Sequence, residues 1–117
     1  MSASGNNGNR AERLAAQFLQ QRGLKLLQQN YHCRFGEIDL VMQDGDTLVF
    51  AEVRLRSRSD FGGASASINH AKQKKLVRAA QHYLAGLVRM PPCRFDAVLL
   101  HTPDGSSIEW VKDAFSC

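Results

Sequence analysis

The chain has 117 residues, of which 44% are hydrophobic and 22% charged, and 15 Lys and Arg against 11 Asp and Glu give a formal net charge of +4. This length fits one domain with its own core, and the composition excludes a disordered, collagen-like or mucin-like chain. A membrane-spanning helix needs about 20 consecutive apolar residues. The apolar runs here are far shorter, so we expect a soluble protein with no membrane partner.

The amino-terminal segment and the cysteines favour a cytoplasmic protein. Residues 1–8 are rich in Ser, Gly and Asn and lack the apolar stretch of a secretory signal, so we expect a disordered tail before a single domain of residues 9–117. The three cysteines are widely spaced and form no CxxC pair. This pattern predicts reduced thiols rather than a disulfide scaffold or a zinc site.

A first helix is expected from Asn9, a favourable N-cap residue, to about Arg22, because Gly23 favours the position after a helix end. Glu12 lies at the margin of its apolar stripe. It could face a site where the helix meets the sheet, or it could simply favour the helix dipole. The stripe consists of Ala11, Leu14, Ala15, Phe18 and Leu19.

A strand over residues 25–33 is expected to precede a β-hairpin. Residues 37–42 and 47–56 are two β-rich runs, and the Asp44-Gly45 pair between them is a strong hairpin signal. The second face of these strands is apolar near the turn and charged at the far end, which predicts helices on both sides of the sheet. The first face is expected to be wholly apolar, with Ile38, Leu40, Met42, Val49, Ala51, Val53 and Leu55.

The remaining elements predict an α/β protein with a mixed central sheet flanked by helices. Residues 57–67 favour a loop, residues 68–87 a second helix, residues 95–101 a buried strand, and residues 108–111 a last short strand. Lys72 falls at the margin of the buried stripe of the second helix, and Lys74, Lys75 and Arg78 lie on its opposite side. That stripe is expected to contain Leu76, Ala80, Tyr83, Leu84 and Leu87.

The charges are segregated along the chain. Residues 35–53 hold five acids and no base, whereas residues 54–89 hold eight bases and one acid. Such an arrangement suits a metal-dependent site that acts on a phosphate backbone, because cations must hold the polyanion near the carboxylates. Two solvated faces of opposite charge explain the same count.

The hairpin brings several of the acids together. If Asp44-Gly45 forms the turn, Glu37 faces Glu52, and if Gly45-Asp46 forms it, Asp39 faces Glu52. Either register places Glu37, Asp39, Glu52 and Arg54 on one face.

Crowded carboxylates repel one another and need a cation, and hard oxygen ligands suit Mg²⁺ or Mn²⁺. The alternative is a solvated sheet end, where Glu37 and Glu52 pair with Arg54 and Arg56.

With Asp39 followed by Glu52-Val53-Arg54, the sequence resembles the PD-(D/E)XK nuclease superfamily, whose sites use an Asp on one strand and a Glu-x-Lys on the next. More narrowly, it resembles the YraN-like family of small bacterial proteins, which is related to archaeal Holliday-junction resolvases. The resemblance covers nearly the whole chain. Its other motifs are Ala11-Glu12, GEIDLV at 36–41, LVFAEVRLR at 48–56, Phe61-Gly62, Lys72-Gln73, Arg78-Ala79-Ala80 and Arg94-Phe95-Asp96.

The resemblance implies a restriction-endonuclease-like αβββαβ core with Asp39 and Glu52 as metal ligands, and Glu12 and Glu37 as further acids. It implies branched or structured DNA as the substrate class, and it is compatible with a homodimer. The phosphate backbone would be held by basic residues in and after the second strand of the hairpin and on the second helix: Arg56, Arg58, Lys74, Lys75 and Arg78.

One departure concerns the lysine of Glu-x-Lys, which is Arg54 here. Arginine holds phosphate well, but its guanidinium stays protonated and so cannot accept a proton from water. Lys72 could reach the same site from the second helix.

Three functions therefore stay open: a metal-dependent endonuclease, a DNA-binding module that has lost catalysis, and an adaptor whose basic helix docks an acidic partner.

Overall fold

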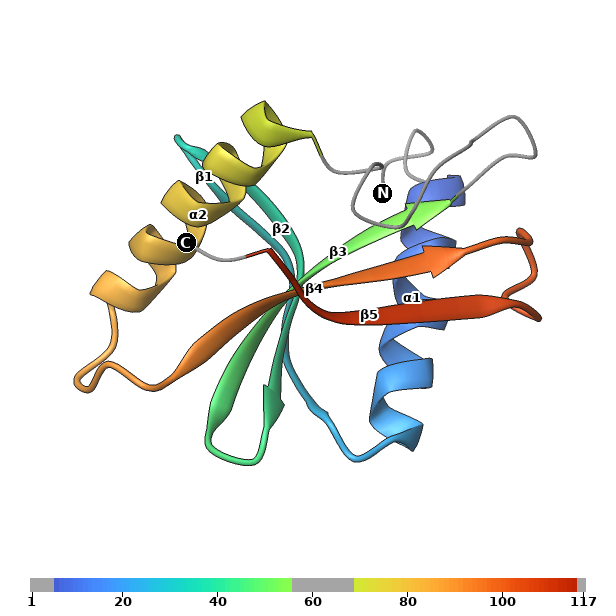
Figure 1. Cartoon of the computed structure of the whole chain (residues 1–117), viewed down its shortest axis with the longest axis horizontal. Coiled ribbons are helices and arrows are strands. Elements are labelled where there is room, and N and C mark those ends of the chain that lie inside the picture. The colour runs from blue at the N-terminus through green and yellow to red at the C-terminus, as the bar shows by residue number, and fades with distance from the viewer. Residues whose placement is uncertain (1–5, 56–68, 116–117) are drawn as a thin grey trace.

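A computed structural model describes residues 6–55 and 69–115, which form a five-stranded mixed sheet with one helix on each face (Figure 1). The strand order is β1-β2-β3-β4-β5, with β3 and β4 parallel and the other neighbours antiparallel. The predicted α/β class is confirmed. The elements are α1 (Asn6–Gln21), β1 (Lys25–Cys33), β2 (Gly36–Asp44), β3 (Thr47–Leu55), α2 (His70–Ala85), β4 (Cys93–Leu100) and β5 (Ile108–Phe115).

The two helices cover opposite faces of the twisted sheet, as Figure 1 shows with α1 in blue and α2 in yellow to orange. The face under α1 is closed by a core that includes Leu19, Leu40 and Val49. The face under α2 is closed by a second core that includes Phe50 and Leu76. Helix α2 covers its face because it connects the parallel strands β3 and β4, which requires a crossover on one side of the sheet, and α1 covers the other face. Within the described residues, neither helix has the length and apolarity that a membrane span requires.

The helix ends differ from expectation in two places. Helix α1 begins at Asn6, so Asn9 lies within the helix and the prediction that it is the N-cap was wrong. Helix α2 begins after Asn69, whose side chain accepts a hydrogen bond from the Lys72 amide at 2.8 Å, and it ends at Ala85. Leu87 is therefore outside the helix and exposed, whereas the sequence placed it in the buried stripe.

The hairpin register is the one with Gly45-Asp46 in the turn, because Asp44 pairs with Thr47. Gly45 has φ 61°, a conformation that glycine adopts without strain. Most of the apolar face forms as expected against α1, but Ile38 packs on the α2 side instead. Pairing between β2 and β3 ends at Leu40, and Asn30, which has φ 57°, stands opposite Asp39 on β1, so the sheet is irregular next to Ile38.

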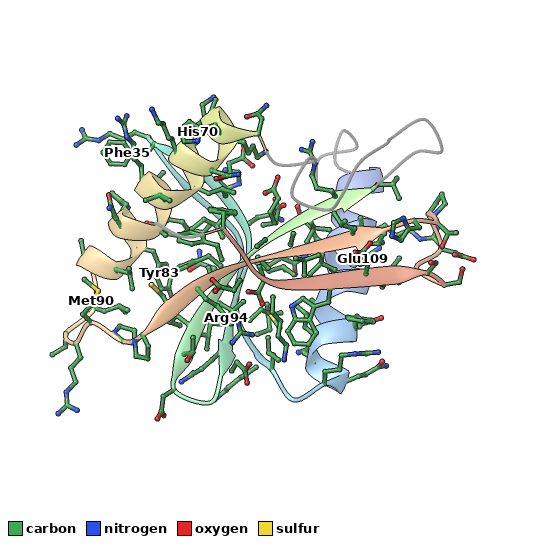
Figure 2. The ribbon with its side chains drawn as sticks, viewed as in Figure 1. Phe35, His70, Tyr83, Met90, Arg94 and Glu109 are labelled. Carbon is green, nitrogen blue, oxygen red and sulfur yellow. The ribbon has the colours of Figure 1, made fainter. Side chains whose placement is uncertain are left out.

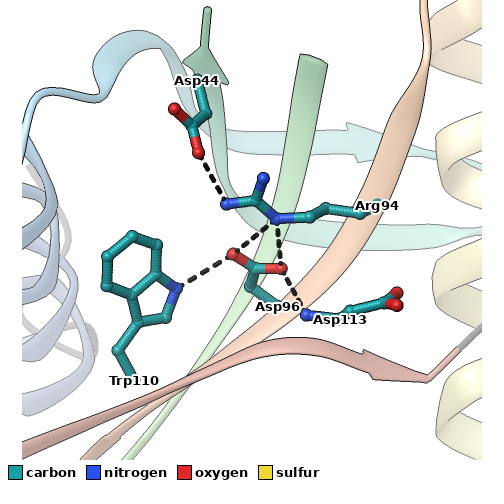
Figure 3. Close-up of polar contacts among 5 residues, drawn as sticks. All are labelled: Asp44, Arg94, Asp96, Trp110 and Asp113. Carbon is teal, nitrogen blue, oxygen red and sulfur yellow. Dashed lines mark hydrogen bonds and ion pairs between the residues drawn. The ribbon is translucent and has the colours of Figure 1, made fainter.

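A buried ion pair joins the carboxyl-terminal strands to the hairpin (Figure 3). Asp96 on β4 is fully buried and accepts hydrogen bonds from Arg94 Nε at 3.0 Å and from Trp110 Nε1 at 2.9 Å, together with the amide of Asp113. A terminal nitrogen of the Arg94 guanidinium donates to Asp44 Oδ2 at 3.0 Å. Each buried charge has several partners, so this cluster fixes β5 and the β2–β3 turn relative to β4.

Candidate active site

Asp39 and Glu52 occupy facing positions where β2 and β3 separate. The last paired residues are Leu40 on β2 and Ala51 on β3. The positions just beyond this pair are Asp39 on β2 and Glu52 on β3. Oδ2 of Asp39 accepts a hydrogen bond from the Val53 amide at 2.8 Å. A side chain of β2 thus replaces a backbone partner of β3 and holds the Asp39 carboxylate beside the Glu52 position.

Glu12 approaches the same place from α1. Its side chain is only 9% exposed, and its Oε1 has no hydrogen-bond partner among the described residues. Two polar residues of β1, Gln29 and Asn30, hydrogen bond with it and lower its pKa. Asn30 has φ 57° in the middle of a strand and faces the Asp39 position in the β1–β2 register. A buried acid with an unsatisfied oxygen is costly unless a proton or a cation supplies the missing partner.

The electrostatics of Glu12 and Glu52 show how closely the carboxylates crowd. Burial raises the pKa of Glu52 to about 7, and the neighbouring Asp39 carboxylate contributes to this rise. The pKa of Glu12 is also raised to about 7, again by burial first and then by Asp39. The Asp39 carboxylate therefore raises the pKa of both acids, which shows that it lies close to each of them.

Lys72 supplies the nearest compensating charge. Its Nζ lies 3.0 Å from Oε2 of Glu52, which is 3% exposed, and it lowers the pKa of Glu52. Arg54 also approaches this oxygen, at 3.7 Å, and the two cationic side chains are about equally exposed, at 41% for Arg54 and 42% for Lys72. Of the two cations, Lys72 thus makes the closer contact, as the sequence had allowed. Glu37 is largely exposed and lies 3.8 Å from His32, so it belongs to the rim of the site.

A pocket of about 250 Å³ opens beside these groups. Acidic residues of the hairpin and basic residues of α2 both face it, and its lining consists of Gly36, Glu37, Asp39, Glu52, Lys72, Lys75 and Leu76. The structure therefore brings Asp39, Glu52 and Lys72 together, with Glu37 at the edge. Lys74 and Arg78 are exposed on α2 outside the lining. Arg56 and Arg58 lie outside the described residues.

The donor set fits a hard divalent cation. Glu12, Asp39 and Glu52 offer carboxylate oxygens here, and Mg²⁺ typically uses one or two of these together with water and phosphate. In residues 6–55 and 69–115, no three Asp, Glu, His or Cys side chains stand at the spacing of a preformed metal site. A bound cation would nevertheless give the unpartnered Oε1 of Glu12 a ligand and would lower the raised pKa of Glu52.

Sequence reasoning missed two features. The Arg94–Asp96 pair was noted only as a family motif, although Arg-x-Asp inside a buried strand signals a buried ion pair. The conformation of Asn30 was also missed, and here the only available signal was that Asn tolerates positive φ better than most residues.

Comparison with known proteins identifies the family. Residues 11–100 match the model of a family described as "Uncharacterised protein family UPF0102". A UPF0102 protein of Nitrosomonas europaea is 58% identical over 115 residues, which cover 98% of both chains. Another, of Nitrosospira multiformis, is 58% identical over 108 residues, covering 92% of this chain and 91% of the relative. A third, of Psychromonas ingrahamii, is 51% identical over 115 residues, which cover 98% of this chain and 93% of the relative. The YraN-like resemblance is thus confirmed, and the chain belongs to UPF0102.

Proposed function

We propose that this protein is a Mg²⁺- or Mn²⁺-dependent DNA endonuclease with a restriction-endonuclease-like core. One observation carries the proposal: carboxylates from β2 and β3, with Glu12 of α1 beside them, meet at a pocket whose other side bears Lys72 and Lys75. A site that joins crowded acids to cations suits a phosphodiester next to a metal. The element order α1-β1-β2-β3-α2-β4 supports the fold assignment, because it matches the order that the resemblance implies.

Each side chain has a role that follows from its position. Asp39 and Glu52 would hold the metal, with Glu12 close enough to assist. The bound metal would supply an activated water and stabilise negative charge on the phosphate. Lys72 would contact the scissile phosphate, and the position of its ammonium at the pocket beside Glu52 supports this role.

The basic surface of α2 would hold the rest of the DNA. The exposed Lys74, Lys75 and Arg78 follow one another at spacings that place them along the solvent side of the helix. Contacts of this kind position a duplex through its phosphates and make binding depend on salt. Neutralising two of these residues should weaken binding and reduce the salt dependence.

Cleavage assays test the proposal. The protein is incubated with linear, flapped and four-way DNA in the presence of Mn²⁺, and we expect cleavage that Asp39→Ala and Glu52→Gln abolish. Glu109→Gln is the matched control, because Glu109 is a half-exposed acid on β5 that pairs with His101. Absence of cleavage on every substrate, or cleavage that survives Asp39→Ala, would refute the proposal.

A second candidate function is a DNA-binding module without catalysis. The observation that favours it is Arg54, which stands where the superfamily has its lysine and contacts Glu52. This candidate predicts salt-dependent DNA binding with no product in any metal. If Arg54→Lys gained cleavage activity that the parent lacks, this second candidate would be preferred. If Lys72→Gln abolished activity of the parent, the endonuclease would be preferred.

A further inference from the structure

An aromatic side chain projects at the tip of the hairpin formed by β1 and β2. Cys33 pairs with Gly36, so Arg34 and Phe35 form a two-residue turn. Phe35 is 37% exposed, and Figure 2 shows it at the end of this hairpin beside α2. The next residue, Gly36, lines the pocket that contains Asp39. The exposed ring is therefore one residue away from the candidate active site.

The turn is held firmly against α2. A Cβ on Gly36 would lie 3.4 Å from the carbonyl oxygen of Lys75, so the two backbones are in close contact. Tyr31 on β1 hydrogen bonds to Nδ1 of His82 on α2. Its ring also packs edge-on against Tyr83, with ring centres 5.2 Å apart. These contacts hold the turn that carries Phe35 in place without a ligand. A ligand that binds to Phe35 would therefore require little change in the conformation of the turn.

Arg34 and the imidazole ring of His82 lie beside the ring of Phe35. The Arg34 guanidinium carbon lies 5.0 Å from the ring centre, and the His82 ring centre lies 5.9 Å from it. Lys75 is adjacent through Gly36, and Glu37 is the acid that follows in the chain. Such a pairing of an exposed aromatic ring with cations recurs where proteins hold single-stranded nucleic acid. The ring offers a stacking surface and the cations attract the flanking phosphates.

We propose that Phe35, flanked by Arg34, is a stacking site for an unpaired nucleobase of DNA next to the phosphate bound in the pocket. This inference rests on the proposed function, because it uses the same pocket as the phosphate site. Bases inside a duplex have both faces covered by their neighbours, so a ring on a turn can stack only on a base in a single strand, at an end or at a branch. The site would therefore select DNA with unpaired bases, and it would do so independently of the metal.

The test compares two DNAs of equal length in EDTA, one with splayed single-stranded arms and one blunt duplex, by fluorescence anisotropy. We expect Phe35→Ala to weaken binding of the splayed DNA roughly tenfold and of the duplex less than roughly twofold, because only the splayed DNA offers an unpaired base for the ring to stack on. Phe35→Tyr keeps the ring and should bind as the parent does. Leu27→Ala is the matched control, since Leu27 on β1 is 39% exposed and lies near the other end of that strand.

A direct readout of stacking separates this role from a merely structural one. A 2-aminopurine placed at the branch should be quenched by the parent and by Phe35→Tyr, but not by Phe35→Ala at saturating protein. Equal losses on both DNAs, unchanged quenching, or an equal effect of Leu27→Ala would overturn the inference. So would preferential quenching of a 2-aminopurine RNA, or failure of the parent to bind either DNA.

The outcome is distinguishable from that of the proposed function. If Phe35→Ala shows the selective loss but no DNA is cleaved in Mn²⁺, the stacking site stands and the endonuclease falls. If cleavage depends on Asp39 but neither binding nor quenching depends on Phe35, the endonuclease stands and the stacking site falls.

Discussion

Glu52→Gln should stabilise the metal-free protein, and the effect should depend on pH. The side chain of Glu52 is almost fully buried, and its pKa is raised from 4.5 to about 7, chiefly by burial and also by Asp39. The folded protein thus holds this proton at pH values where the unfolded chain has released it. The free energy of unfolding therefore falls as the pH rises from about 4.5 to about 7, and the full loss is reached above about 7.

The size of the effect follows from the pKa. A rise from 4.5 to about 7 corresponds to about 3 kcal/mol of folding free energy at high pH. Gln carries no charge at any pH, so Glu52→Gln should be more stable than the parent by about 3 kcal/mol at pH 8 and by less than about 1 kcal/mol at pH 4.5. The pKa of about 7 for Glu52 already contains the attraction of Lys72, which lowers this pKa.

Urea unfolding at pH 4.5, 6 and 8 in EDTA measures this difference. The fluorescence of Trp110 reports it, since this residue is the one tryptophan of the chain and packs against Phe18. With a urea m-value of about 1.5 kcal/mol per molar, the midpoint at pH 8 should rise by about 2 M. Glu37→Gln is the control, because Glu37 is 63% exposed at the rim of the same pocket and should change stability little. A Glu52→Gln protein that is no more stable than the parent at pH 8 would refute the reasoning.

Three further changes test other parts of the structure. Asp96→Ala should lower the free energy of unfolding by about 3–5 kcal/mol in urea denaturation, because it leaves Arg94 partly buried without its main partner, and a loss below about 1 kcal/mol would contradict the buried ion pair. Asn30→Ala should be less stable than Asn30→Gly by about 1 kcal/mol in the same assay, since φ 57° strains alanine but not glycine, and the reverse order would contradict the assigned backbone. Lys72→Gln should raise the pKa of Glu52 further and lower stability by about 1 kcal/mol at pH 8 but not at pH 4.5, whereas an equal loss at both pH values would show that Lys72 acts through packing.

Much of the fold could be predicted because local signals and burial patterns agreed. The Asp-Gly turn signal predicted the hairpin, and two apolar strand faces predicted helices on both sides. The structure confirms both helices, since a core with Leu40 lies under α1 and a core with Phe50 lies under α2. The choice between the two hairpin registers could not be made from sequence, because both keep the same residues on the same face. In the structure Asp44 pairs with Thr47, which identifies the register with Gly45-Asp46 in the turn.

The candidate site was predictable in its residue types but not in its details. Alternation along β2 predicted that Ile38 would share a face with Leu40 and Met42, yet Ile38 packs in the core under α2 whereas the other two pack in the core under α1. Glu12 lies at the margin of a helix stripe, so the sequence allowed it either to face a site or simply to favour the helix dipole. The packing of α1 against the sheet shows that Glu12 is buried. Such tertiary effects carry no local signal in the sequence.

In the proposed site, carboxylates from two adjacent strands share a divalent cation, with Glu12 beside them. A crystal soaked with Mn²⁺ and measured for anomalous scattering tests it most directly. The account predicts an anomalous peak within bonding distance of both Asp39 and Glu52, which disappears in Asp39→Asn. A well-ordered crystal with no peak there, or with a peak that persists in Asp39→Asn, would contradict the account.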